Sequence, residues 1–175
     1  MNRFLNRCMA VLLAFALASC AQTPPPPPSD PLAYSLGKWR ELKAANGNDY
    51  LYDSTFLSTF GFGSITTFEI TDDQVTARSY EGFDENGAIT ETWTERGAEI
   101  GSHESGEPAR TVEQVYDECR NTVLAQDRDA NTVNLVFSND ILQFCDYSAN
   151  NCADDCTVGV SIENLRFTGR PEQPE

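Results

Sequence analysis

The chain has 175 residues, of which 40% are hydrophobic and 22% charged, a composition typical of one globular domain with accessory segments. Its formal net charge is −15. So acidic a chain is poorly suited to nucleic acid, whose phosphates select Lys and Arg, and to peripheral docking on anionic lipid headgroups. We expect the charge to serve mainly solubility, with a basic partner or divalent cations as alternatives.

Residues 1–19 have the pattern of a secretory signal. Arg3 and Arg7 are their only charged residues, and the apolar run AVLLAFAL follows at 10–17. As a helix this run would span about 12–14 Å, well short of the roughly 30 Å hydrocarbon core of a bilayer. A basic start, a short apolar stretch and then small residues are typical of a segment that directs export and is removed. The chain that remains has 10 basic and 27 acidic residues, a net charge of −17.

The junction Leu17-Ala18-Ser19-Cys20 resembles the lipobox of bacterial lipoproteins, an aliphatic residue and two small residues before a cysteine. The resemblance implies that the Cys20 sulfur receives a diacylglycerol, that signal peptidase II cuts before Cys20, and that the new amine carries a further acyl chain such as palmitate. Two or three such chains anchor a protein durably where one does not. Ala21 replaces the Asp that retains such proteins in the inner membrane, which favours the periplasmic or surface face of an outer membrane.

Residues 20–30 predict a tether behind the lipidated cysteine. The segment QTPPPPPSD at 22–30 contains five consecutive prolines, which favour an extended polyproline II helix. At about 3.1 Å per residue, it makes a stiff spacer of roughly 25–30 Å. We expect a single folded domain over 31–168 and a disordered tail at 169–175.

A helix is predicted at the start of the domain. Asp30 is a good N-cap, Pro31 suits the first helical position, and Gly47 can end the helix. Apolar residues recur between them at helical spacing, namely Leu32, Leu36, Trp39 and Leu42.

The pattern then changes to the period of two that is typical of strands. Strands are expected at 50–59, 65–71, 75–80 and 89–96. The turns between them are predicted at Gly61-Phe62-Gly63-Ser64, Asp72-Asp73-Gln74 and Asp84-Glu85-Asn86-Gly87. The glycines of the first turn match neither a P-loop nor a dinucleotide fingerprint, so we interpret them as a hairpin turn.

A second helix is predicted after Thr111, which has the capping-box spacing to Gln114. The helix has an apolar face with Val112, Val115, Cys119 and Val123. Strands at 132–138, 141–147 and 156–167 complete the chain, with a hairpin turn at Ser138-Asn139-Asp140. The sum is an α+β fold, an antiparallel sheet of about seven strands with two helices packed on it, in the order α-ββββ-α-βββ.

Four cysteines of the domain predict two disulfides, because their number is even and the protein is expected outside the cytosol. Cys119 lies on the buried face of its helix, so it should meet a strand cysteine. We favour Cys119–Cys145 with Cys152–Cys156, the latter closing the tight loop of sequence CADDC. The alternative is Cys119–Cys156 with Cys145–Cys152. A zinc site would need reduced thiolates, and C-x-x-x-C lacks the paired C-x-x-C spacing of most structural zinc sites.

The remaining polar motifs assign no catalytic, cofactor-binding or metal-binding residue. His103 is the only histidine, it lies in a predicted exposed loop, and no G-x-S-x-G elbow accompanies it. Residues 127–131 begin like a calcium loop, but Thr132 and Ser138 replace the Gly and Glu that such a loop requires. Asp154-Asp155 is interpreted as a solvated turn, with cation contact as the alternative.

Trp39, the Tyr50-x-Tyr52 pair and the alternating strands around Asp72-Asp73 resemble a bacterial family of small exported domains of unknown function, over residues 39–80. This resemblance implies no activity. We therefore expect a membrane-anchored cell-envelope lipoprotein with a non-enzymatic binding or structural domain. Its partners would be the lipid bilayer, through the anchor, and an envelope protein, but not nucleic acid. The alternatives are a cation or small-ligand binding module and a carboxylate-based hydrolase.

Overall fold

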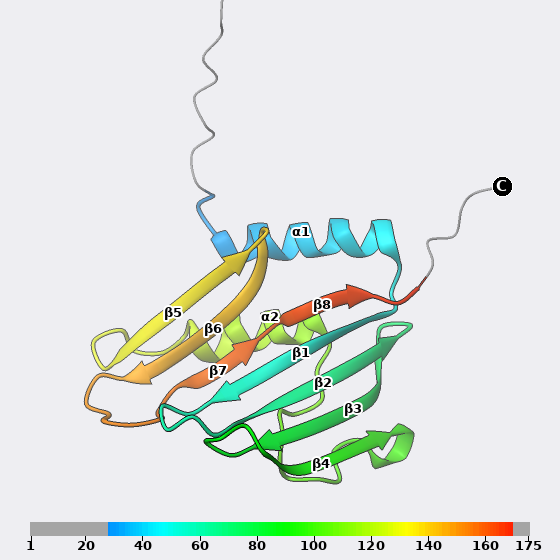
Figure 1. Cartoon of the computed structure of the whole chain (residues 1–175). Helices are drawn as coiled ribbons and strands as arrows, with labels where there is room; N and C mark the ends of the chain where they lie inside the picture. Colours follow the sequence, from blue (N-terminus) through cyan, green and yellow to red (C-terminus); the bar gives the residue numbers. More distant parts are fainter. Residues whose placement is uncertain (1–27, 170–175) are drawn as a thin grey trace, which may run out of the picture.

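The computed structural model describes residues 28–169 (Figure 1). The predicted signal peptide and Cys20 therefore lie outside the described residues, as do most of the tether and of the tail. The helices are α1 (Pro31–Asn46) and α2 (Val112–Glu118), and the strands are β1 (Tyr50–Leu57), β2 (Gly63–Thr71), β3 (Gln74–Phe83), β4 (Ile89–Arg96), β5 (Asn131–Ser138), β6 (Ile141–Ala149), β7 (Val158–Ser161) and β8 (Glu163–Phe167). The α+β class is confirmed, with eight strands in place of about seven.

Both helices begin as their capping residues predict. The Asp30 side chain accepts a 2.9 Å hydrogen bond from the Ala33 N–H, and Pro31 occupies the first helical position. At the other end of α1, Gly47 adopts a φ of 97°, a left-handed value that glycine tolerates best. The capping box of α2 is present in both directions between Thr111 and Gln114.

The strands form two antiparallel sheets where the sequence predicted one. Their orders are β4-β3-β2-β1-β8 and β5-β6-β7. In Figure 1, α2 lies behind the strands and α1 runs along the upper edge. Core side chains from both helices and both sheets pack together, among them Trp39, Tyr50, Phe68, Val115 and Leu142.

The single strand predicted at 156–167 is divided between the sheets. β7 pairs with β6, whereas β8 pairs with β1. The chain changes sheets at Ile162, whose N–H donates to the Gln143 carbonyl at 2.9 Å. Asn164 then has a positive φ of 48°. A period-two pattern reports which residues alternate in burial but not which strand they pair with, so the sequence could not reveal this change.

Both disulfides have the pairing that the sequence analysis favoured. Cys119–Cys145 joins fully buried sulfurs with a Cα–Cα distance of 5.6 Å. Cys119 opens a π-helical turn, η2 (Cys119–Val123), that follows α2, so this bridge ties the helical segment to β6. Cys152–Cys156 closes the loop between β6 and β7.

Candidate functional site

A buried ion pair joins the inner faces of β3 and β4, the faces directed toward the core. Arg78 Nε lies 2.9 Å from Glu95 Oε2, and Arg78 Nη2 lies 3.0 Å from Glu95 Oε1. The two side chains are only 3% and 1% exposed. Arg78 stands directly opposite the core residue Phe68 in the β2–β3 register, which explains its burial. Two charges so far from water require further polar partners.

The loop between β4 and α2 supplies those partners. Glu95 accepts hydrogen bonds from the N–H groups of Gly101 at 2.7 Å and His103 at 2.6 Å. Arg78 donates in turn to the carbonyl oxygens of His103 at 2.9 Å and Glu107 at 3.0 Å. The hydrogen bonds from Arg78, supported by those loop N–H groups, hold the pKa of Glu95 well below its ordinary value.

An aromatic stack completes this arrangement. The Trp93 ring lies 5.2 Å from Tyr80 and 4.5 Å from His103, and the Arg78 guanidinium lies 4.6 Å from the Trp93 centroid. His103 also places Nδ1 3.0 Å from Glu95 Oε1, although its side chain is 45% exposed, in keeping with its predicted loop position. We call Arg78, Glu95, Trp93 and His103 the loop clamp, because they hold residues 97–110 on the sheet.

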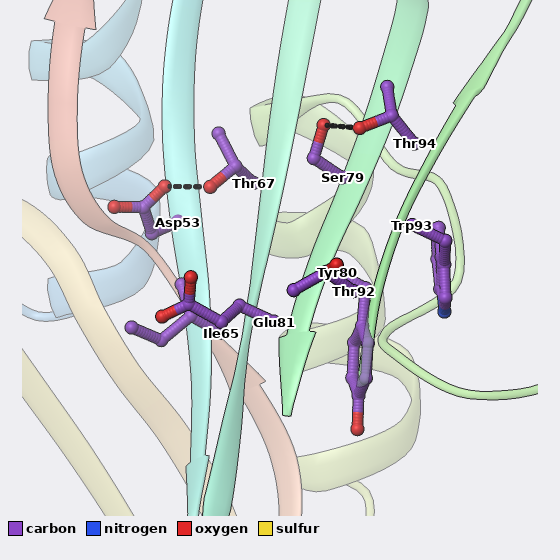
Figure 2. Close-up of a pocket in the computed structure, with 9 residues that line it drawn as sticks. All are labelled: Asp53, Ile65, Thr67, Ser79, Tyr80, Glu81, Thr92, Trp93 and Thr94. Atoms are coloured by element: carbon purple, nitrogen blue, oxygen red, sulfur yellow. Dashed lines mark hydrogen bonds between the residues drawn. The ribbon is translucent and has the colours of Figure 1, made fainter. Parts of the chain in front are cut away.

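The outer face of the same sheet carries a shallow hollow of about 470 Å³ (Figure 2). Its polar lining residues come from four strands, and they are Asp53, Thr67, Ser79, Glu81, Thr92 and Thr94. Asp53 accepts from Thr67 Oγ1 at 2.7 Å and from Asn164 Nδ2 at 2.9 Å, and Ser79 pairs with Thr94 at 3.0 Å. Much of the hollow's polar chemistry is therefore used within the sheet.

The hollow does not bring a histidine to its hydroxyl groups. Successive side chains of a strand point to opposite faces. Thr92 and Thr94 therefore point to the outer face, whereas the ring of Trp93, which also lines the hollow, points to the inner face, where the His103 ring stacks on it. A general base must lie within roughly 2.6–3.2 Å of the proton it removes.

Within residues 28–169, no group of three or more Asp, Glu, His or Cys side chains is placed to hold a metal ion.

The β1–β2 hairpin exposes four large apolar side chains, which we call the hairpin tip. They are Phe56 at 40%, Leu57 at 65%, Phe60 at 62% and Phe62 at 43% exposure. The Phe56 and Phe62 rings lie 6.2 Å apart. The turn lies at 58–62, earlier than the predicted Gly61-Phe62-Gly63-Ser64, because Gly63 and Ser64 already belong to β2. The apolar surface was not predicted, although large apolar residues within a turn depart from the usual polar composition of turns.

The acidic motifs singled out in the sequence form turns. Asp155 accepts from Ser58 Oγ at 2.5 Å and from the Thr59 N–H at 2.9 Å, and the Ser58 hydrogen bond is the main cause of its lowered pKa. Asp154 and Asp155 are both exposed, as expected for a solvated turn, and Asp155 also ties this turn to the β1–β2 turn. In the 127–131 segment, Asp127 accepts from the Asp129 N–H within the turn.

No family model, curated protein or solved structure matches the chain. The resemblance over residues 39–80 therefore stays a prediction. None of the helices within residues 28–169 combines the length and the apolar character needed to cross a membrane.

Proposed function

We propose that the protein is a membrane-anchored lipoprotein of the cell envelope whose folded domain binds a partner or serves a structural role without catalysis. The observation that carries this proposal is the Leu17-Ala18-Ser19-Cys20 junction behind a basic start and a short apolar run. The two disulfides within the domain support it, because such bonds persist mainly in compartments outside the cytosol.

Two surface features support a binding role over catalysis. The hairpin tip exposes neighbouring apolar side chains, and exposed apolar clusters are characteristic of interaction sites. The hollow on the outer face offers hydroxyl groups and carboxylates, but the only histidine is on the other side of β4 and is engaged by Glu95.

Intact-mass spectrometry of the full-length protein expressed in a Gram-negative host tests the anchor. The expected product is residues 20–175 plus lipid, found in the membrane fraction, with four thiols that react only after reduction. Cys20→Ser should abolish the lipid mass and the processing. The matched control Cys8→Ser, which changes a cysteine inside the signal, should leave both intact. An unlipidated protein in the wild type would contradict the proposal.

A small-ligand or cation module is the second candidate, and the hollow favours it. Asp53 and Glu81 both contribute carboxylates to this open surface. Titration with Ca²⁺ or Mg²⁺ while the melting temperature is recorded would test it. This candidate would be favoured if the ion raised the melting temperature of the wild type and of Glu104→Gln, on the clamped loop, but not that of Glu81→Gln. No rise with either ion would remove the cation module.

A further inference from the structure

Three loops meet at one end of the five-stranded sheet, namely 58–62, 84–88 and 150–157, at the left in Figure 1. Asp155 joins the first and third loops through its hydrogen bonds to Ser58 and Thr59. The first and second loops also lie side by side, because a Cβ atom added at Gly61 would lie 3.5 Å from the Glu85 carbonyl oxygen. The three loops therefore form one continuous surface.

The centre of this surface is apolar. It contains the hairpin tip, in which Phe60 and Leu57 are the most exposed side chains. The apolar area extends to β4, because the Phe83 ring packs against Gly63 and Phe83 stands opposite the exposed Ile89 in the β3–β4 register. Nothing within residues 28–169 covers these exposed side chains.

The rim of the surface is acidic. The three loops carry Asp84, Glu85, Asp154 and Asp155, and they contain neither Lys nor Arg. Such a rim attracts basic groups and repels acidic ones. An aromatic centre that is dehydrated on contact, surrounded by a charged rim, is the arrangement that gives protein interfaces their affinity and their specificity.

We infer that this end of the sheet docks a protein partner whose contact surface is apolar at its centre and basic at its rim. The inference rests on the proposed binding role and identifies its surface and the chemistry of its partner. Lipid fits less well, because membrane-interface segments favour Trp and Tyr, with Lys and Arg where headgroups are anionic, and the three loops have none of these. A second copy of the chain would bring two acidic rims together.

The test uses residues 21–175, which contain every described element and both disulfides, without the lipid. The probe is a helical peptide of Leu and Lys with an apolar stripe between two basic flanks, and fluorescence anisotropy measures its binding at low and moderate salt. The wild-type chain should bind it in preference to a Leu and Glu peptide of equal length. The double variant Phe60→Ser/Phe62→Ser should bind at least about tenfold more weakly.

Two variants serve as controls for this comparison. Val136→Ser on β5 also replaces an exposed apolar side chain, outside the three loops, and should bind like wild type. Asp84→Asn/Glu85→Gln should lower the salt dependence of binding, because it removes two charges from the rim. Urea unfolding of each variant checks the fold, and Leu57→Ser, at the most exposed tip position, replaces the Phe60/Phe62 double variant if the latter unfolds.

Three results would overturn the inference. Equal peptide binding by wild type and Phe60→Ser/Phe62→Ser would show attraction by overall charge alone. Tip-dependent sedimentation with vesicles of zwitterionic phosphatidylethanolamine and phosphatidylcholine would make lipid the occupant. If analytical ultracentrifugation showed a dimer that the tip variant abolishes, the occupant of the surface would be a second copy of the chain. None of these measurements involves Cys20, so failure here leaves the lipoprotein proposal standing, and failure of lipidation leaves this result intact.

Discussion

The two disulfides should differ in their contribution to stability, because they close loops of very different length. Cys119–Cys145 spans a sequence separation of 26 residues, and Cys152–Cys156 spans only 4. If a disulfide acts by restricting the unfolded chain, the longer loop contributes about 3.5 kcal/mol and the shorter about 2 kcal/mol. Cys119 and Cys145 are also fully buried, so replacing both with Ala adds a cavity cost, whereas the other pair lies nearer the surface.

Urea unfolding of residues 21–175 provides the measurement. Cys119→Ala/Cys145→Ala should lower the free energy of unfolding by at least about 3.5 kcal/mol and the melting temperature by about 10 °C. Cys152→Ala/Cys156→Ala, the matched control, should cost about 2 kcal/mol or less. Equal losses, or a greater loss from the second pair, would refute the loop-length argument. Wild-type protein with four thiols that react before reduction would refute the disulfides themselves.

Three further predictions concern the clamp, a cap and two glycines. The pKa of Glu95 is depressed in the folded state, so the Glu95 carboxylate stabilises the protein above its ordinary pKa of 4.5, and this stabilisation is lost as the pH falls below that value. The decline in unfolding free energy below pH 4.5 should therefore be smaller in Glu95→Gln than in Glu104→Gln. An identical decline in both variants would contradict the clamp. Thr111→Ala should cost about 1 kcal/mol in urea unfolding by removing half of the capping box of α2, and an unchanged midpoint would argue against that cap. Gly37→Ala should raise the unfolding free energy by up to about 1 kcal/mol, because Gly37 lies mid-helix with open space at its Cβ position. Gly159→Ala should lower the melting temperature, because the added Cβ would collide with the backbone of Cys145 and Asp146. The opposite order of melting temperatures would contradict both predictions.

Local chemistry allowed the ends of helices and several turns to be predicted from the sequence. Asp30 and Gly47 mark the two ends of α1, because a capping oxygen and a glycine with positive φ both act within a few residues of the chain. The turn at Asn139-Asp140 likewise follows from side chains that tolerate positive φ, here 50° and 65°. The burial of Cys119 could also be predicted, from the apolar face of its helix, but that burial did not decide between Cys145 and Cys156 as its partner.

The candidate surfaces were harder to predict, because they depend on residues that only the tertiary structure brings together. Alternation indicated which residues of β3 and β4 share a face, but not that Arg78 and Glu95 would meet inside the protein and hold a distant loop. Likewise, the phenylalanines of the β1–β2 turn are visible in the sequence, but only the tertiary structure shows that the neighbouring loops leave them exposed.

The sequence by itself determined the local features of this protein: the signal pattern, the lipobox resemblance, the α+β class, the helix caps and the periodicity of most strands. Each of these depends on residues close together in the chain, where spacing alone specifies the chemistry. Only the tertiary structure decided that the last predicted strand divides between two sheets at Ile162 and that an apolar surface with an acidic rim forms where three loops meet. These features depend on pairing and packing between distant segments, for which a one-dimensional pattern contains no partner information.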